Sequence, residues 1–212
     1  MKRVIDRRVV PVVVIENAEL AVPLAEAIAA GGLDLIEITF RTAAAADAIK
    51  RIRQALPSML VGAGTLLQPD QVARAVDAGA GFGVAPGLNP KIVAKAQALK
   101  LPFCPGVMTP SDVEAGLELG CTMLKFFPSE AAGGVKMLKA IGAPYAHTGV
   151  KFIPTGGINM TNVAEYFALP LVGAIGGTWL AEAKLINEKQ WAEITRRTRE
   201  VVALATQTPA KK

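Results

Sequence analysis

Short apolar runs rich in β-branched residues alternate along the chain with longer segments whose apolar residues recur at helical spacing. Runs that are apolar on both faces are typical of parallel strands buried beneath helices. Eight segments of each kind follow one another, strand before helix. The expected strands are 9–15, 35–40, 59–63, 81–85, 102–107, 123–127, 151–155 and 171–175. The expected helices are 18–30, 43–54, 69–78, 90–99, 111–119, 134–141, 161–167 and 188–206.

This repetition, without a break in composition, predicts an α/β fold in which residues 1–212 form a single (β/α)8 TIM-barrel domain. The alternative is an open, doubly wound sheet. Such a sheet commonly has fewer strands at this length, and the segment GAGT at 62–65 lacks the spacing of a dinucleotide-binding loop. In a barrel, function lies at the carboxyl ends of the strands, so candidate residues are sought there.

Composition excludes two classes of protein. Half of the residues (51%) are apolar and only 19% are charged, which excludes an intrinsically disordered chain. No run approaches the roughly 18 apolar residues that a membrane-spanning helix needs, so we expect a soluble protein without a membrane partner.

The formal net charge of +5 would suit an anionic ligand. The basic residues are scattered and are not interleaved with aromatic residues, so no nucleic-acid partner is expected. The cluster of Arg196, Arg197 and Arg199 and the ending 209–212 are interpreted as solvated surface.

Cysteine and histidine are scarce. Cys104 and Cys121 make no disulfide framework, and the N-terminus lacks the apolar region of a signal peptide, so a cytoplasmic location is expected. The single histidine, His147, is expected in a surface loop. It leaves no cluster that could hold a catalytic zinc, so no metal is expected. No cofactor is expected either.

The expected strand 35–40 contains a carboxylate that faces the barrel interior. Alternation along the strand puts Glu37 and Arg41 on one face and the isoleucines on the other. Because helices cover the outer face, Glu37 points inward, where a charge is costly without a partner. Arg41 is a candidate partner. Glu37 is therefore either half of a structural ion pair or a reactive group.

The expected strand 123–127 places a lysine on the same interior face. Lys125 alternates with Leu124 and Phe126, which point to the helices. An ordinary lysine amine is almost fully protonated at pH 7, and apolar surroundings disfavour its charged form. Lys125 is therefore a candidate nucleophile; the alternative is a fixed cation that reaches the rim or binds phosphate.

Two glycine pairs follow the last two expected strands, in PTGGI at 154–158 and in IGGTW at 175–179. Phosphate commonly binds at these two loops of a barrel, on backbone amides and a helix N-terminus. Each pair alone is equally typical of a turn. Together with a carboxylate and a buried lysine, they favour carbonyl chemistry on a phosphorylated substrate.

With these residues in view, the chain resembles the 2-keto-3-deoxy-6-phosphogluconate (KDPG/KHG) aldolases, a family of 2-dehydro-3-deoxy-phosphogluconate aldolases. The resemblance extends from about residue 10 to about residue 202. Its motifs are PVVVI at 11–15, GGLDLIEITFRT at 31–42, VGAGT at 61–65, VAPG at 84–87, PFCPGVMTPSD at 102–112, KFFPSEAAGGVKMLKAIGAP at 125–144, PTGGI at 154–158 and GGTW at 176–179.

The resemblance implies a class I aldolase of the Entner–Doudoroff pathway, which cleaves 2-dehydro-3-deoxy-6-phospho-D-gluconate to pyruvate and D-glyceraldehyde 3-phosphate. It also implies cleavage of 4-hydroxy-2-oxoglutarate to pyruvate and glyoxylate, a homotrimer, and no metal. Lys125 would form the Schiff base and Glu37 would be the general acid and base. The remaining implied residues are Arg41 and Thr65 on the pyruvyl carboxylate, Pro86 and Phe127 as apolar walls, Thr155 lining the site, and Gly156, Gly157, Gly176, Gly177 and Thr178 on the phosphate.

Two features depart from the family pattern. Serine often stands where this chain has Thr178, and the segment before the first strand is short, which predicts a reduced helix at the barrel bottom. Three other functions stay open. They are an aldolase or decarboxylase for a related 2-keto acid such as the phosphogalactonate epimer or oxaloacetate, a phosphosugar isomerase or epimerase, and a non-enzymatic assembly subunit.

Overall fold

The computed structural model describes residues 1–208, so the interpretation of 209–212 as solvated surface lies outside the described residues. Its strands are β1 (Val9–Val13), β2 (Leu35–Thr39), β3 (Leu60–Gly64), β4 (Phe82–Val84), β5 (Phe103–Cys104), β6 (Gly106–Val107), β7 (Met123–Phe126), β8 (Lys151–Phe152) and β9 (Ile175–Gly177). None of the helices in residues 1–208 has the length and hydropathy that a membrane crossing requires.

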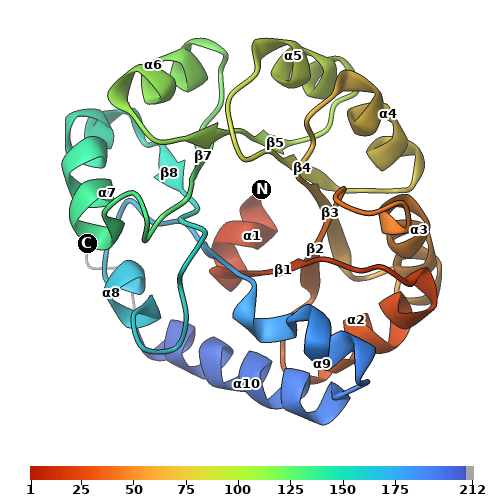
Figure 1. Cartoon of the computed structure of the whole chain (residues 1–212). Coiled ribbons are helices and arrows are strands. Elements are labelled where there is room, and N and C mark those ends of the chain that lie inside the picture. The colour runs from red at the N-terminus through yellow and green to blue at the C-terminus, as the bar shows by residue number, and fades with distance from the viewer. Residues whose placement is uncertain (209–212) are drawn as a thin grey trace.

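The α-helices are α1 (Lys2–Arg7), α2 (Ala21–Ala30), α3 (Ala45–Ala55), α4 (Pro69–Asp77), α5 (Pro90–Ala98), α6 (Pro110–Glu118), α7 (Gly134–Gly142), α8 (Val163–Phe167), α9 (Ala183–Asn187) and α10 (Trp191–Gln207). Short 3-10 helices cover η1 (Ala18–Leu20), η2 (Ala143–Thr148) and η3 (Trp179–Ala181). Most of the helices form a ring outside the strands (Figure 1).

All paired strands are parallel, and they form two sheets with the orders β5-β4-β3-β2-β1-β9 and β6-β7-β8. On one side the sheets join through the expected strand 102–107, which Pro105 divides into β5 and β6. Proline has no N–H for the ladder, but the Pro105 carbonyl still accepts from Lys125 N at 2.8 Å. On the other side they join through bridges from Phe152 to Val172 and from Thr155 to Gly176. The eight expected strands thus form one barrel, as predicted.

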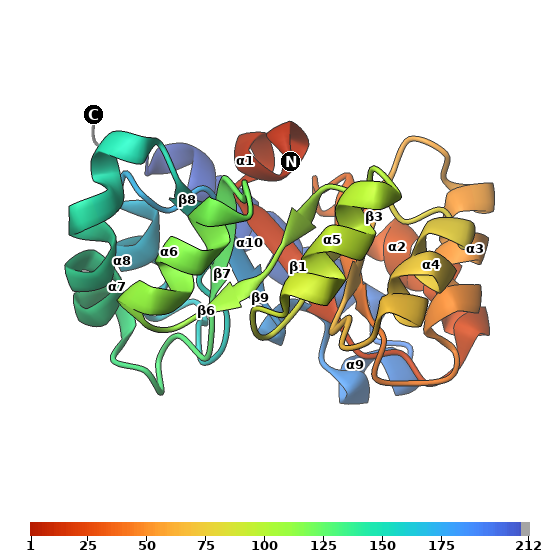
Figure 2. The same cartoon turned by 90° about the horizontal axis from the view of Figure 1, so that it is seen from above.

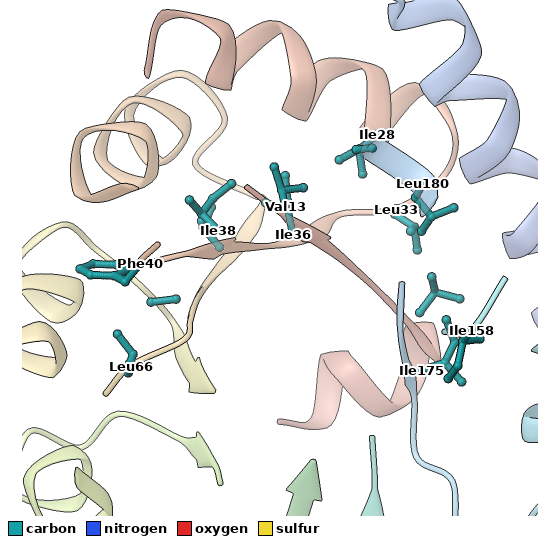
Figure 3. Close-up of a cluster of buried hydrophobic side chains, with 14 of the residues drawn as sticks. Val13, Ile28, Leu33, Ile36, Ile38, Phe40, Leu66, Ile158, Ile175 and Leu180 are labelled. Atoms are coloured by element: carbon teal, nitrogen blue, oxygen red, sulfur yellow. The ribbon is translucent and has the colours of Figure 1, made fainter. Parts of the chain in front are cut away.

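Two separate hydrophobic clusters show which way the strand residues face. The larger cluster lies between strands and helices and includes Ile36, Ile38 and Phe126. Figure 3 shows the two isoleucines of β2 on its helix-facing side, close to Val13 of β1. The smaller cluster lies inside the barrel and includes Leu35 and Met123. The predicted inward and outward faces of these two strands are therefore confirmed.

Helix α1 closes the amino-terminal end of the barrel. It has six residues, and Val4 is fully buried in the interior cluster while its neighbour Ile5 is 38% exposed. Figure 1 shows α1 in the middle of the ring of strands, and Figure 2 places it at the opposite end of the barrel from α9. The reduced helix predicted at the barrel bottom is thus a single short helix that inserts one valine.

Several expected boundaries were wrong at the ends of elements. The expected strand 151–155 pairs regularly only over β8, which Pro154 follows closely, and the expected strand 171–175 is shifted to β9. The helix expected over 18–30 begins as η1, because Asn17 accepts from Glu19 N at its start. The helix expected over 188–206 begins at Trp191 and is preceded by the unpredicted α9.

The remaining surface predictions can be compared directly with the structure. Cys104 and Cys121 are free and buried, and His147 is exposed, although it lies in η2 rather than in an irregular loop.

The arginine cluster of the outer helix α10 is only partly solvated surface. Arg196 and Arg199 are exposed, as predicted. The prediction was wrong for Arg197, which is half-buried because its guanidinium donates to the Trp179 carbonyl at 2.6 Å.

Replacement of Val4 by alanine should lower the free energy of unfolding by about 2 kcal/mol, because two buried methyl groups are lost and a cavity remains. Urea denaturation measures this difference. Ile5→Ala, on the exposed side of the same helix, should cost less than half as much. Equal effects of the two substitutions would contradict the assignment of α1 as the plug of the barrel.

Candidate active site

A buried lysine and a buried glutamate lie together near the carboxyl-terminal end of the barrel. Lys125 Nζ on β7 is 4.0 Å from Glu37 Oε1 on β2, and their side chains are 7% and 4% exposed. The two residues come from the two different sheets, far apart in the sequence. The structure therefore brings together the two residues that were predicted separately to carry the chemistry.

The environment of Glu37 holds a proton more firmly than water would. Burial raises the pKa of Glu37, and the positive charge of Lys125 only partly opposes this rise. Glu37 Oε1 accepts no hydrogen bond from residues 1–208. A carboxyl group in this state is suited to exchange a proton with a bound molecule.

The prediction that Arg41 partners Glu37 was wrong. Lys125 is the ion-pair partner, while Arg41 is exposed and forms no ion pair with any residue in 1–208. The reason is its position: β2 ends at Thr39, and Arg41 lies two residues beyond it. Its guanidinium thus remains accessible for an anionic ligand at the barrel mouth.

Small residues make room for the buried pair. A side-chain carbon at Gly64 would overlap Glu37 Oε1. Gly106 is the partner of Lys125 in the ladder between β6 and β7, and a side-chain carbon there would overlap the carbonyl of Pro86. The close approach of neighbouring backbones therefore requires glycine at these two positions.

Phe127 and Pro86, the predicted apolar walls, line one pocket. Leu88, Met108 and Pro128 also contribute to it. The Nζ atom of Lys125 lies 5.1 Å from the centre of the Phe127 ring. The Phe127 ring therefore lies between Lys125 and the loop after β8, because a side-chain carbon at Gly156 would be 3.4 Å from Phe127 Cε2.

The loop that follows β8 turns its carbonyl groups into the protein. The carbonyls of Thr155 and Gly156 accept from the amides of Ser129 and Glu130, at 2.8 and 3.0 Å. The Gly157 carbonyl accepts from the Asn162 amide at 3.2 Å. The amides of Gly157 and Ile158 donate to no acceptor in residues 1–208. Free backbone amides in a glycine loop suit an anion such as phosphate.

The neighbouring loop after β9 offers a further amide. Thr155 bridges to Gly176, and a side-chain carbon at Gly176 would overlap the Thr155 hydroxyl. Gly177 ends β9, and the exposed Thr178 precedes η3. The Thr178 amide has no acceptor within the described part of the chain. The helix N-terminus expected here belongs to a 3-10 helix of only three residues.

Thr65 has an unusual backbone. It follows β3 directly and has a φ of 57°, which a β-branched residue rarely adopts. Such strain is often found at binding and catalytic sites.

Within residues 1–208 the structure contains no group of three or more His, Cys, Asp or Glu side chains suited to hold a metal ion.

Sequence reasoning missed the layer behind the loop after β8. Ser129 and Tyr166 are both buried, and their hydroxyl oxygens are 2.8 Å apart. The Tyr166 hydroxyl also donates to Glu130 Oε1. Ser129 and Glu130 lie inside the motif KFFPSEAAGG, but nothing in the sequence indicates that Tyr166 would reach them.

The chain matches the family model described as KDPG and KHG aldolase over residues 1–197. The 2-dehydro-3-deoxy-phosphogluconate aldolase of Haemophilus influenzae is 48% identical over 197 residues, which cover 93% of this chain and 92% of that protein. The KHG/KDPG aldolase of Escherichia coli K12 is 44% identical over 194 residues, with coverages of 92% and 90%.

A solved structure shares the fold closely. It is KDPG aldolase from Legionella pneumophila with pyruvate captured as a covalent carbinolamine intermediate. Its TM-score to this chain is 0.90 and its sequence identity 41%, and the alignment covers 94% of this chain and 96% of that one.

Two glycines of the pocket should respond differently to alanine. Gly106→Ala should lower the free energy of unfolding by about 1–3 kcal/mol, because the new carbon overlaps the backbone of Pro86. Gly87→Ala is the matched control, since no atom lies within 4 Å of its side-chain position, and its effect should stay within about 0.5 kcal/mol. Chemical denaturation distinguishes the two, and a neutral Gly106→Ala would contradict the described packing.

Proposed function

The chain belongs to the KDPG and KHG aldolase family, and from this premise we propose that Lys125 and Glu37 are the residues with which it cleaves 2-dehydro-3-deoxy-6-phospho-D-gluconate to pyruvate and D-glyceraldehyde 3-phosphate. The protein is a carbon–carbon lyase. The observation that supports the proposed residues best is the pairing of a buried amine with a buried carboxylate at 4.0 Å.

Lys125 supplies the nucleophile. Its neutral amine attacks the C2 ketone of the substrate, and loss of water leaves a protonated imine. The imine draws electrons from the C3–C4 bond, because it lies next to C3. The low exposure of the Lys125 side chain and its position 4.0 Å from Glu37 support this role, because they place the amine inside the barrel beside a group that can move protons.

Glu37 supplies the base and acid. Its carboxylate removes the proton of the C4 hydroxyl through a water molecule as the C3–C4 bond breaks. The aldehyde leaves, and the electron pair of that bond becomes the enamine of pyruvate. The protonated Glu37 then delivers a proton to C3, and hydrolysis of the imine releases pyruvate and restores the amine.

The rest of the mouth binds the two anionic ends of the substrate. Arg41 is accessible for the pyruvyl carboxylate, and Thr65 lies at the strained end of β3. The amides of Gly157, Ile158 and Thr178, which donate to no acceptor in residues 1–208, bind the phosphate. Gly156, Gly176 and Gly177 complete these two loops, and Thr155 lies between them.

A second substrate is 4-hydroxy-2-oxoglutarate, which would give pyruvate and glyoxylate. The name of the Escherichia coli relative, KHG/KDPG aldolase, favours it. An isomerase on the same barrel would need a carboxylate but no buried amine, so Lys125 favours the lyase. We also propose a cytoplasmic homotrimer, which follows from the family resemblance and from the free thiols of Cys104 and Cys121.

Borohydride reduction in the presence of pyruvate should attach a reduced pyruvyl group to Lys125, because only an imine is converted to a stable secondary amine. Peptide mass spectrometry measures the adduct. Lys151 on the neighbouring β8 is an internal control, since its Nζ donates to Pro170 O and it should stay unmodified. An unmodified Lys125 would overturn the proposed Schiff base.

Glu37→Gln should still trap pyruvate but should lose turnover by about 10²-fold or more, because the amide cannot accept the proton. In the parent, kcat/KM should fall as the pH drops through the pKa of Glu37, which burial raises above that of an ordinary glutamate, because the base is then protonated. Release of pyruvate, followed against pH, measures both effects. Unchanged turnover would show that another group moves the proton.

A further inference from the structure

A buried hydroxyl network lies directly behind the loop that follows β8. Ser129 and Tyr166 are fully buried with their hydroxyl oxygens 2.8 Å apart, and the Tyr166 hydroxyl donates to Glu130 Oε1. Within residues 1–208 none of the three forms a hydrogen bond or ion pair with Lys125 or Glu37, and the proposed reaction gives them no role. Burial and the bond to Glu130 raise the pKa of Tyr166, so its hydroxyl stays protonated and can donate.

The backbone of the same segment holds the start of the loop. The amides of Ser129 and Glu130 donate to the carbonyls of Thr155 and Gly156, at 2.8 and 3.0 Å. The Glu130 side chain lies under Gly157, where a side-chain carbon would come within 2.6 Å of Glu130 Cβ. Ser129 and Glu130 thus fix the direction of the Thr155 and Gly156 carbonyls, and the Glu130 side chain limits how closely Gly157 can approach.

Helix α8, which bears Tyr166, holds the other end of the loop. It begins shortly after the loop, and Asn162 at its start donates to the Gly157 carbonyl at 3.2 Å. The Ile158 side chain is buried in the core, and Figure 3 shows it beside Ile175 of β9. The Ile158 side chain therefore holds the loop against β9. Asn162 ties the loop to α8, and Tyr166 ties α8 to the segment after β7.

These contacts have a common consequence for the peptide planes. A carbonyl that bonds inward turns the N–H of the next residue outward, because the two groups point in opposite directions across one planar peptide. The carbonyls of Gly156 and Gly157 bond inward, and the amides of Gly157 and Ile158 have no acceptor in the described chain. The network thus holds in place the peptide planes whose amides are free.

We propose that Ser129, Glu130 and Tyr166 are positioning residues that hold the loop 155–158 with its amides presented to the substrate phosphate. The inference rests on the proposed function, because it assigns this loop to the phosphate. Under this inference the site has two parts. The network serves recognition of the phosphoryl group, whereas formation of the pyruvate imine at Lys125 does not depend on the network.

Tyr166→Phe removes one hydroxyl from the network. It should raise KM for 2-dehydro-3-deoxy-6-phosphogluconate roughly tenfold, the effect of one lost hydrogen bond, with kcat changed less than about twofold. The concentration of pyruvate that gives half-maximal borohydride trapping should change less than twofold, because pyruvate has no phosphate. Binding of inorganic phosphate, measured by calorimetry, should weaken by a similar factor to KM.

Matched variants test the assignment. Tyr145→Phe also removes a tyrosine hydroxyl, but one that bonds to Pro110 O and Glu114 at the surface, and it should leave all three measurements unchanged. Glu130→Gln keeps an acceptor for Tyr166 and should recover most of the affinity that Glu130→Ala loses. Ser129→Ala serves in place of Tyr166→Phe if thermal denaturation shows that the latter is unfolded.

The outcomes separate this inference from the proposed function. Equal losses for pyruvate and for the phosphorylated substrate, or no loss for either, would overturn the positioning role. A parent protein that traps no pyruvate would instead overturn the proposed function, and the calorimetric comparison with inorganic phosphate would still test the network.

Discussion

A carboxylate and an amine taken out of water inside a barrel lose far more solvation than an exposed pair, and the active end of this protein is organised around that cost. Glu37 and Lys125 form an ion pair at 4.0 Å. Glu37 Oε1 accepts no hydrogen bond from the part of the chain that the structure describes. The pair is therefore held ready for a bound molecule, which a fully satisfied structural ion pair would not be.

The barrel accommodates this pair because its interior has an apolar layer near α1 and a polar layer toward the carboxyl ends of the strands. The lower part is filled by apolar side chains, including Leu35, Phe82 and Met123, and α1 closes it with Val4. The polar side chains lie above this layer. The strand positions next to these polar side chains are glycines. Gly64 on β3 leaves space for the Glu37 carboxylate, so β2 and β3 can still pair. Rigid packing below and small residues beside it keep two long side chains in one arrangement.

The two loops proposed to bind phosphate follow a different principle. The amides of Gly157, Ile158 and Thr178 donate to no acceptor in residues 1–208, so they can supply the donors without a cationic side chain. Their direction depends on contacts from behind, which come from the segment after β7 and from α8. The same β7 that bears Lys125 leads directly into Ser129 and Glu130. The residues proposed for imine formation and those proposed to position the phosphate loop thus lie on adjoining stretches of one strand and the segment after it.

Much of the architecture could be predicted from the sequence, because burial imposes local patterns. Alternation alone placed Glu37 and Lys125 inside and Ile36 and Ile38 outside, and eight repeats of strand and helix indicated the barrel. The ends of elements were less well predicted, since Pro105 and Pro154 interrupt ladders whose extent depends on neighbouring strands.

What the sequence by itself determined is thus the set of inward-facing polar residues and the loops that have glycine pairs, because each follows from a period of two or a short motif. Only the tertiary structure decided which charges meet. It paired Glu37 with Lys125 and left Arg41 exposed, and it brought Tyr166 to Ser129 and Glu130 across 37 and 36 positions of sequence. Such contacts depend on how elements far apart in the sequence pack against one another, which neither a period of two nor a short motif specifies.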